Sequence, residues 1–425
     1  MEIQTRRFDL VGETVESARL ENGLQVVVVP KKGFSGYAAC FGTWYGALMR
    51  RFELGGVLHT TPAGVAHYLE HKMFDMPDGD NALQRMTADG ADPNAFTDYD
   101  ETVYHFRCTE NFYDNLRELL RFVSTPHFTA QTVEKERGII AQEIRMYDDD
   151  PDDAVYQQLL RLLYRSHALR DDIAGTVESI AEITPEILYD CHGAFYVPGN
   201  MCLCAVGDVE IERVCALADE LLGREERPMP RALLDEEQSA PEKLYAERIM
   251  SVSQPLFTMG AAFVPAEGTE ALRERITSRL ALRLLCGRST PLYARLYGKG
   301  LINRSFSASA GFNGNTAVLS FGGESRDPSA VYEALLTEIE RVAAEGFDPA
   351  DFERARRATI GAQLRGYEDL FGLCVGSFNA AREDRYVFDA AELIREIRAE
   401  DCRALLSRVL VRDRTALSVV KAKQT

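Results

Sequence analysis

Apolar residues that follow Pro62 recur at the spacing of an α-helix; they are Val65, Tyr68, Leu69, Met73 and Phe74. Thr61 can cap this helix, and Pro62 can stand in its first turn, where the backbone N–H has no partner in any case. Elsewhere the apolar positions form short extended runs, of which residues 24–29 are the longest. The pattern therefore predicts a chain that mixes helices with buried strands.

The order of the predicted elements repeats along the chain: extended apolar segments, a helix, further strands, then helices and a closing strand. Residues 128–137 are similar to residues 347–356, and residues 140–145 are similar to residues 360–365. This similarity between the two parts of the chain indicates an internal duplication.

Residues 223–243 lie between the two copies and carry prolines and charged residues with little periodicity, which is typical of a linker. We therefore predict two homologous domains, residues 1–222 and 244–425, of about 200 residues each. The expected fold class is α+β, in which each domain is a mostly antiparallel sheet with helices on one face.

Composition narrows the classes of function. The net charge is −18 and no run of Lys and Arg is present, so nucleic acid is not an expected partner. The acidity is compatible with an enclosed chamber that attracts basic peptides, and also with solubility alone, which we favour. No apolar run reaches the roughly 18 residues of a membrane span, so no membrane segment is expected.

The N-terminal residues and the cysteines bear on the location of the protein. Residues 1–10 contain acidic residues and no apolar core, so we expect neither a secretory signal nor a transit peptide there. The nine cysteines are odd in number and scattered, and Cys202 and Cys204 alternate within an apparent buried strand. We expect them to be small core residues of a protein in the reduced cytoplasm.

Two histidines lie four residues apart in the predicted helix, in the order His67-Tyr68-Leu69-Glu70-His71. Residues i and i+4 share one face of a helix, so both imidazoles can reach one metal ion. Glu70 shares that face, and a carboxylate beside zinc can take a proton from zinc-bound water, whose pKa falls to about 7. This order, His-x-x-Glu-His, is the inverzincin arrangement of zinc peptidases.

A catalytic zinc ion usually has three protein ligands, so the two histidines need a third. The other five of the seven histidines form no second motif, and His105 and His127 are expected to be packing or surface residues. Glu143 is the better candidate, because it lies seven residues from Glu136 and two helical turns place both on one face. One of them can bind the metal while the other supports a ligand. The second copy has Gln363 at this place and no His-x-x-Glu-His, so it cannot form such a site.

Four segments taken in order resemble those of one family: its zinc helix, its substrate-binding edge strand, the helix of its third ligand and the strand that closes its first half. They are residues 64–74, residues 90–97 with 102–104, residues 136–143, and residues 195–201 with 206–208. The chain thus resembles the pitrilysin, insulin-degrading enzyme and mitochondrial processing peptidase family, above all its short bacterial members. Glu143 follows His71 by 72 residues, and the resemblance extends over essentially the whole chain.

The resemblance implies a zinc-dependent endopeptidase with one zinc ion per chain. It implies that His67, His71 and Glu143 are the zinc ligands. Glu70 would be the general base and acid, and Glu136 would support a ligand. It also implies that the two halves form half of a clamshell, and that a peptide backbone joins an edge strand formed by Asn94, Ala95, Phe96 and Thr97. Unfolded or extended peptides would enter such a chamber, and folded proteins would not.

The second half departs from the family at one point. Active members carry an Arg and a Tyr seven residues apart, which reach the substrate and its developing oxyanion. In the matching segment Leu296 and Asn303 stand at these positions, although Arg295, Tyr297 or Arg304 could substitute in another register. The simplest explanation is a heterodimer in which a homologous chain without the zinc motif supplies the pair. The alternative is a homodimer.

Two other classes of function compete with a self-sufficient enzyme. The chain could be a zinc-loaded peptide-binding or assembly subunit that is active only with its partner. Activity of the single chain on unstructured peptides distinguishes this subunit from a self-sufficient enzyme. A purely structural zinc site is disfavoured, because such sites usually have four ligands rich in cysteine and no cysteine lies near the motif.

Overall fold

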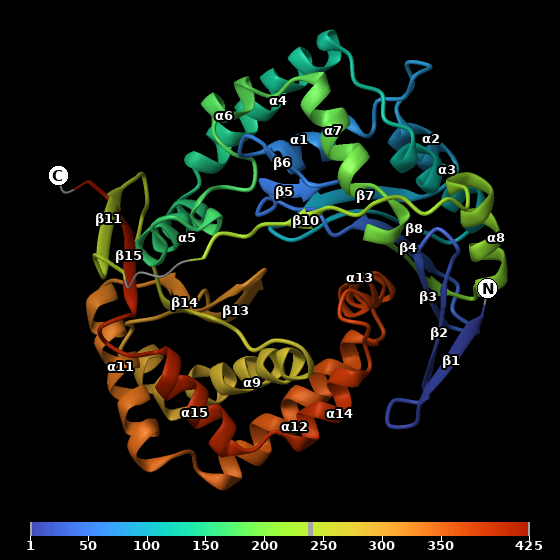
Figure 1. Cartoon of the computed structure of the whole chain (residues 1–425). Coiled ribbons are helices and arrows are strands. Elements are labelled where there is room, and N and C mark those ends of the chain that lie inside the picture. The colour runs from blue at the N-terminus through green and yellow to red at the C-terminus, as the bar shows by residue number, and fades with distance from the viewer. Residues whose placement is uncertain (1, 237–240, 424–425) are drawn as a thin grey trace. The chain divides into compact units, whose positions relative to one another are not determined.

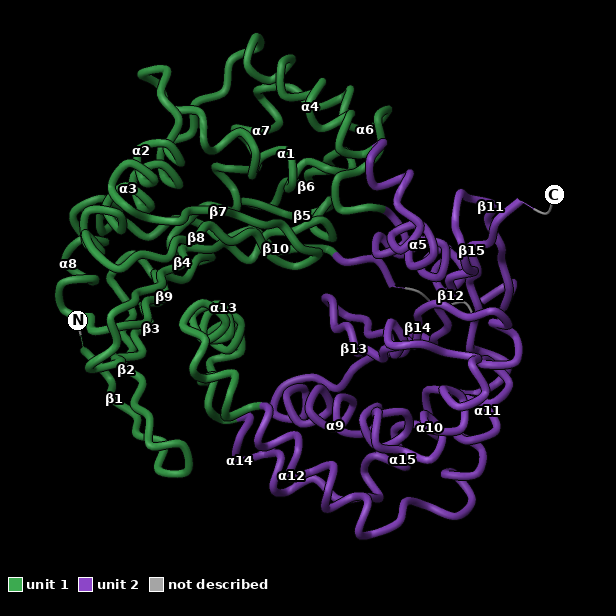
Figure 2. The backbone as a smooth tube through the Cα atoms, turned by 180° about the vertical axis from the view of Figure 1, so that it is seen from behind, with its two compact units in different colours: residues 1–144, 172–233, 363–389 green, residues 145–171, 234–362, 390–425 purple. Residues whose placement is uncertain are grey.

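The computed structural model describes residues 2–236 and 241–423, whose helices and strands are shown in Figure 1. Contacts between residues divide the chain into two compact units, which Figure 2 colours separately. Unit 1 contains residues 1–144, 172–233 and 363–389, and unit 2 contains residues 145–171, 234–362 and 390–425.

Each unit contains mainly one copy of the duplicated sequence, together with one helix of the other copy. Unit 2 includes α5 (Pro151–Leu163), and unit 1 includes α13 (Leu370–Ala381). The predicted domain limits, 1–222 and 244–425, refer to the duplication in the sequence and stay a prediction. Of the predicted linker, residues 237–240 lie outside the described residues, and the described part contains the short strand β10 (Arg231–Ala232).

Unit 1 is built on a seven-stranded sheet in the order β1-β2-β3-β9-β4-β8-β7. All neighbours are antiparallel except β3 and β9, which are parallel. The strands are β1 (Ile3–Phe8), β2 (Glu13–Arg19), β3 (Gln25–Pro30), β4 (Tyr37–Thr43), β7 (Asp92–Thr97), β8 (Thr102–Cys108) and β9 (Met201–Gly207). A small second sheet joins β10 to β5 (Arg51–Leu54) and β6 (Val57–Thr60).

Helices cover both faces of the large sheet. Thr43 of β4 donates a hydrogen bond of 2.7 Å to the carbonyl of Phe195, at the end of α7 (Pro185–Phe195), whereas Gly42 faces Phe378 of α13. Successive strand residues point to opposite faces, so α7 and α13 lie on opposite sides of the sheet (Figure 1). A Cβ atom on residue 42 would stand 2.6 Å from the Phe378 ring, which explains the glycine. The central strand β9 is consequently buried along its whole length.

The other helices of unit 1 carry the candidate site or cover the face on which α7 lies. They are α1 (Val65–Lys72), α2 (Ala82–Ala88), α3 (Phe112–Ser124), most of α4 (Ala130–Asp148), α6 (Val177–Ala181) and α8 (Ile211–Leu222).

The predicted helix after Pro62 is confirmed as α1, but it begins at Val65. Gly64 precedes it with a φ of 91°, and a Cβ there would collide with the carbonyl oxygen of Ala174. Thr61 and Pro62 therefore lie before the helix, and the prediction that they cap and start it is wrong. The backbone conformation of Gly64 decides where the helix begins.

Unit 2 contains a five-stranded sheet in the order β11-β15-β12-β14-β13, in which only β11 and β15 are parallel. The strands are β11 (Tyr245–Ile249), β12 (Leu256–Phe263), β13 (Ser307–Asn313), β14 (Thr316–Glu324) and β15 (Ala416–Lys421). The helices are α5, α9 (Thr269–Cys286), α10 (Pro291–Gly298), α11 (Pro328–Glu345), most of α12 (Pro349–Gly366), α14 (Asp389–Glu396) and α15 (Ala399–Val409).

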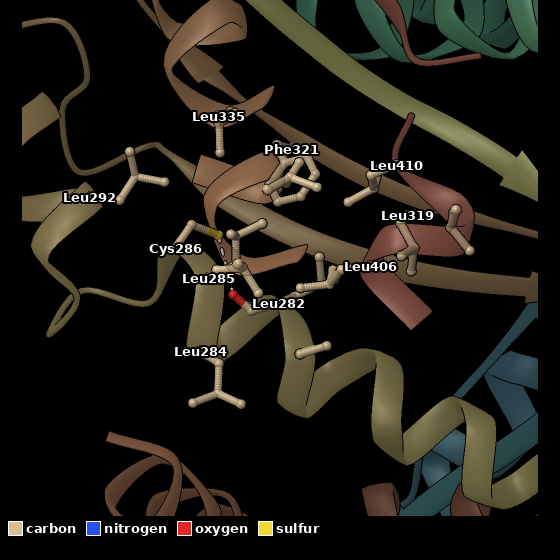
Figure 3. Close-up of a cluster of buried hydrophobic side chains, with 14 of the residues drawn as sticks. Leu282, Leu284, Leu285, Cys286, Leu292, Leu319, Phe321, Leu335, Leu406 and Leu410 are labelled. Carbon is tan, nitrogen blue, oxygen red and sulfur yellow. Dashed lines mark hydrogen bonds between the residues drawn. The ribbon is translucent and has the colours of Figure 1, made fainter. Parts of the chain in front are cut away.

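The core of unit 2 lies between this sheet and the helices α9, α11 and α15. Leu285 of α9, Phe321 of β14 and Leu406 of α15 belong to one buried cluster, which Figure 3 shows. On β12, Phe257 belongs to the same cluster, whereas its neighbour Leu256 packs with apolar residues of α5. Hence α5 covers the opposite face of this sheet, as α13 does in unit 1.

The structure confirms the α+β class and the predominance of antiparallel pairing. The helix on the second face of each sheet is an addition that was not predicted. All nine cysteines are buried, which confirms their predicted place in the core. Within the described parts of the chain, no helix is long and apolar enough to cross a membrane.

Candidate metal centre

Helix α1 carries His67, Glu70 and His71, and the two histidines contact glutamates of α4. The centroids of the His67 and His71 rings lie 4.6 Å apart. The buried hydroxyl of Tyr68 in the same helix donates a hydrogen bond to the carbonyl of Val133 in α4. This bond ties together the two helices that form the site.

Helix α4 brings Glu143 to both histidines. Its carboxylate oxygens lie 3.7 Å from Nε2 of His67 and 3.5 Å from Nε2 of His71. The three candidate ligand atoms lie within 4.8 Å of one another, and no other group of this kind occurs in the described residues. Ligands about 2.1 Å from a tetrahedral zinc ion are about 3.4 Å apart, so these residues fit the ion with small adjustments. Two imidazoles and one carboxylate are also a donor set that catalytic zinc sites use.

Burial sets the protonation of His67, and a hydrogen bond orients the ring of His71. Burial, followed by the charge of His71, lowers the pKa of His67 to about 3, so this ring is neutral at neutral pH. Glu136 Oε1 lies 3.0 Å from Nδ1 of His71. Because a carboxylate only accepts, Nδ1 carries the proton and Nε2 is left as the ligand atom.

The pKa of His71 is raised despite its burial. Burial lowers it, but the hydrogen bond with Glu136 and the charges of Glu70 and Glu143 outweigh this effect. Four ionisable groups are therefore coupled in a small volume. A cation bound here would favour the neutral ring, since metal and proton compete for the same nitrogen.

Glu70 lies beside the cluster and is 7% exposed. Its pKa is raised, chiefly by burial; the hydrogen bond from Thr97 and the charge of His71 oppose the shift, and the charge of Glu143 adds to it. Thr97 Oγ1 donates to Glu70 Oε2 over 2.6 Å. A buried carboxyl group with a raised pKa in a polar site is a candidate for general acid and base catalysis.

The four residues predicted to bind substrate lie in β7, at one edge of the sheet of unit 1. Asn94 is exposed, whereas Ala95, Phe96 and Thr97 are partly buried. Among the described residues β7 pairs only with β8, and no strand pairs with its other edge. The contact of Thr97 with Glu70 places this edge directly beside the histidine cluster.

In unit 2, neither residue at the predicted Arg and Tyr positions is a free polar group. Leu296 is 2% exposed and belongs to the hydrophobic core. Asn303 is partly buried and hydrogen-bonds Glu324 and Ser305. Of the predicted substitutes, Tyr297 is 46% exposed. Arg295 and Arg304 are exposed as well.

Three histidines outside the motif, His105, His127 and His192, are buried or partly buried. His105 is buried and its ring centroid lies 4.3 Å from that of Phe371, which agrees with the predicted packing role. His127 is partly buried. His192 is buried and contacts the carbonyl of Val123 over 3.0 Å.

The sequence did not predict the hydrogen bond from the side chain of Thr97 to Glu70. Residues 94–97 were expected to act through their backbone, as an edge strand does. The alternation of a strand shows that Thr97 and Ala95 share a face, but it does not show that this face meets α1.

Two models of one protein family match the chain. The model described as insulinase (peptidase family M16) matches residues 55–177, and the model described as peptidase M16 inactive domain matches residues 182–359. A Bacillus subtilis protein described as the uncharacterized zinc protease YmfH is 35% identical over 429 residues, which cover 99% of this chain and 100% of that protein.

Solved structures agree with these matches. The crystal structure of an M16-like peptidase from Alicyclobacillus acidocaldarius has a TM-score of 0.93 and 32% identity, with 100% of this chain and 99% of that chain covered. A protease from Helicobacter pylori has a TM-score of 0.81 and 18% identity, with 96% and 99% covered, a likeness that concerns the fold alone.

Proposed function

Because the chain belongs to the insulinase family of peptidases, family M16, we propose that it is a zinc-dependent endopeptidase that cleaves unfolded or extended peptides. One observation carries the proposal: ligand atoms of His67, His71 and Glu143 lie within 4.8 Å of one another. In this proposal the three residues hold one zinc ion, and Glu70 is the general base and acid.

The chemistry divides between the ion and the chain. Zinc bound here would lower the pKa of a coordinated water to about 7 and polarise the peptide carbonyl. Glu70 accepts the proton of the attacking water as the C–O bond forms, and then gives it to the leaving amine as the C–N bond breaks. Glu136 holds the His71 ring through Nδ1, so that Nε2 keeps its direction toward the site.

The open edge of β7 provides the basis for substrate selection. A peptide that adds to this edge forms backbone hydrogen bonds with residues 94–97, so the site selects an extended conformation more than particular side chains. Thr97 ends this strand next to Glu70, which brings the bound backbone close to the base.

We expect hydrolysis of unstructured peptides at internal bonds to depend on zinc. Dialysis against a chelator should remove the activity of the purified protein, together with any partner that it requires, and added zinc should restore it. Mass spectrometry of the products and metal analysis of the protein measure the two quantities. A tightly folded protein of similar sequence length serves as the uncut control. Peptide cleavage that persists in metal-free protein contradicts the proposal.

The zinc affinities of two variants should show which of Glu136 and Glu143 in α4 binds the metal. Glu143→Gln is expected to lower the affinity at least about tenfold, because a neutral amide replaces an anionic ligand. Glu136→Gln should lower it less, since the amide oxygen can still accept from His71 Nδ1. Competition with a fluorescent chelator measures both variants. Glu134→Gln, at a side chain on α4 that is 70% exposed, is the matched control. Full zinc affinity in the Glu143 variant would move the third ligand elsewhere.

A second candidate function is that of a zinc-loaded subunit that works only with a homologous chain lacking the zinc motif. Its support is the surroundings of Leu296 and Asn303: the first is buried in the core of unit 2, and the second is hydrogen-bonded there. In this case the partner supplies the Arg and Tyr that stabilise the oxyanion in the family.

A further inference from the structure

We infer that the hydroxyl of Thr97 is a positioning group for Glu70: it holds one carboxylate oxygen and so directs the other toward the attacking water. This inference rests on the proposed function, because Glu70 needs a fixed direction only if it is the base. It gives the side chain of Thr97 a task separate from that of its backbone.

The geometry between the two residues is close and enclosed. Thr97 Oγ1 donates to Glu70 Oε2 over 2.6 Å, which is the length of a charge-assisted hydrogen bond. Glu70 is 7% exposed, so few water molecules can replace this donor. A glutamate side chain has several rotamers, and a base that is misplaced by about 1 Å can lose about 100-fold in rate.

The neighbouring hydroxyl of Thr102 does not supply a proton to Thr97. Thr102 Oγ1 donates to the backbone carbonyl of Tyr45 over 2.9 Å, and its only proton is used there. It lies 3.3 Å from Thr97 Oγ1 and can therefore only accept from it. The proton of Thr97 has two acceptors, and the Glu70 carboxylate oxygen at 2.6 Å is nearer than Thr102 Oγ1 at 3.3 Å.

Thr97 also links the base to the substrate edge. It is the last residue of β7, and its side chain lies on the face that meets α1. The same residue therefore offers its backbone to a peptide strand and its hydroxyl to Glu70. A substitution that keeps the backbone and the shape of the side chain but removes the hydroxyl should change kcat and leave KM nearly constant.

The experiment compares Thr97→Val, which has nearly the same shape without the hydroxyl, with Thr97→Ser, which keeps the hydroxyl. We expect the Val variant to lose about 10- to 100-fold in kcat, with KM within about twofold and zinc content unchanged. The Ser variant should recover most of the lost turnover. Thr5→Val, at an exposed position of β1 in the same sheet, controls for the general effect of this replacement.

Crystal structures of the two variants give a readout that does not depend on turnover. The Glu70 carboxylate should keep its direction in the Ser variant and turn in the Val variant. An unchanged kcat or an unmoved Glu70 in the Val variant overturns the inference, as does a Ser variant as slow as the Val variant. Zinc-dependent turnover of the unmodified protein, together with any partner that it requires, is measured alongside. If it fails, the proposed function is wrong; if it holds while Thr97→Val is fully active, only the role of Thr97 is wrong.

Discussion

Glu70→Gln is expected to abolish peptide hydrolysis while zinc stays bound. The amide cannot accept the proton of the attacking water, and general acid and base catalysis contributes about 10²- to 10⁴-fold to such reactions. Zinc content should remain that of the unmodified protein, because the candidate ligands are His67, His71 and Glu143. Hydrolysis rate and zinc per chain are measured on the same preparation.

A glutamate outside the site supplies the control for this substitution. Glu134→Gln makes the same chemical change on the exposed side of α4 and should leave turnover as it was. Unchanged turnover in the Glu70 variant would remove Glu70 from the mechanism. Loss of turnover together with loss of zinc would instead show that Glu70 supports metal binding.

The isolated chain is expected to be a poor peptidase, and a homologous partner carrying the Arg and Tyr should raise its turnover. Loss of one preorganised oxyanion donor costs about 10²- to 10³-fold in kcat, and Leu296 and Asn303 provide neither donor. The partner should lack the His-x-x-Glu-His motif. Turnover of the chain alone and of the reconstituted pair is compared on one unstructured peptide, with light scattering to establish which assembly forms.

The alternative outcome of this comparison is a self-sufficient homodimer. Tyr297 or Arg304 would then take the place of the missing pair, since both side chains are exposed. High turnover of the single chain that no partner improves would show the heterodimer to be wrong. Loss of that turnover in Tyr297→Phe or Arg304→Gln would identify the replacement.

The spacing of apolar residues predicted single helices and strands, whose formation depends on neighbouring residues in the sequence. The apolar spacing after Pro62 predicted α1, and the run at residues 24–29 predicted β3. The start of α1 was not predictable, because it depends on how closely Gly64 approaches Ala174 in a distant loop.

The sequence also did not predict that α13 packs in unit 1 and α5 in unit 2. Periodicity shows that a helix is buried, but it does not show which strands bury it. Phe378 of α13 packs on Gly42, which lies 336 residues earlier in the chain. Only the folded chain brings these two positions together.

The candidate metal ligands were easier to predict than their supports. His67 and His71 lie on one helix, whose geometry fixes their separation, and Glu143 followed from its spacing to Glu136 and from the family resemblance. The hydrogen bond from Thr97 depends on the packing of β7 against α1, which no spacing within either element reveals.

The position of α13 affects the order in which the protein can fold during synthesis. All strands of the sheet of unit 1 have been made once β9 ends at Gly207, but α13 is complete only at Ala381. Until then, the sheet face around Gly42 has no helix to cover it and exposes apolar surface, which favours aggregation. A first half made alone would keep this bare face permanently. We therefore expect each copy of the duplicated sequence, made as a separate chain, to lack one helix that covers its sheet.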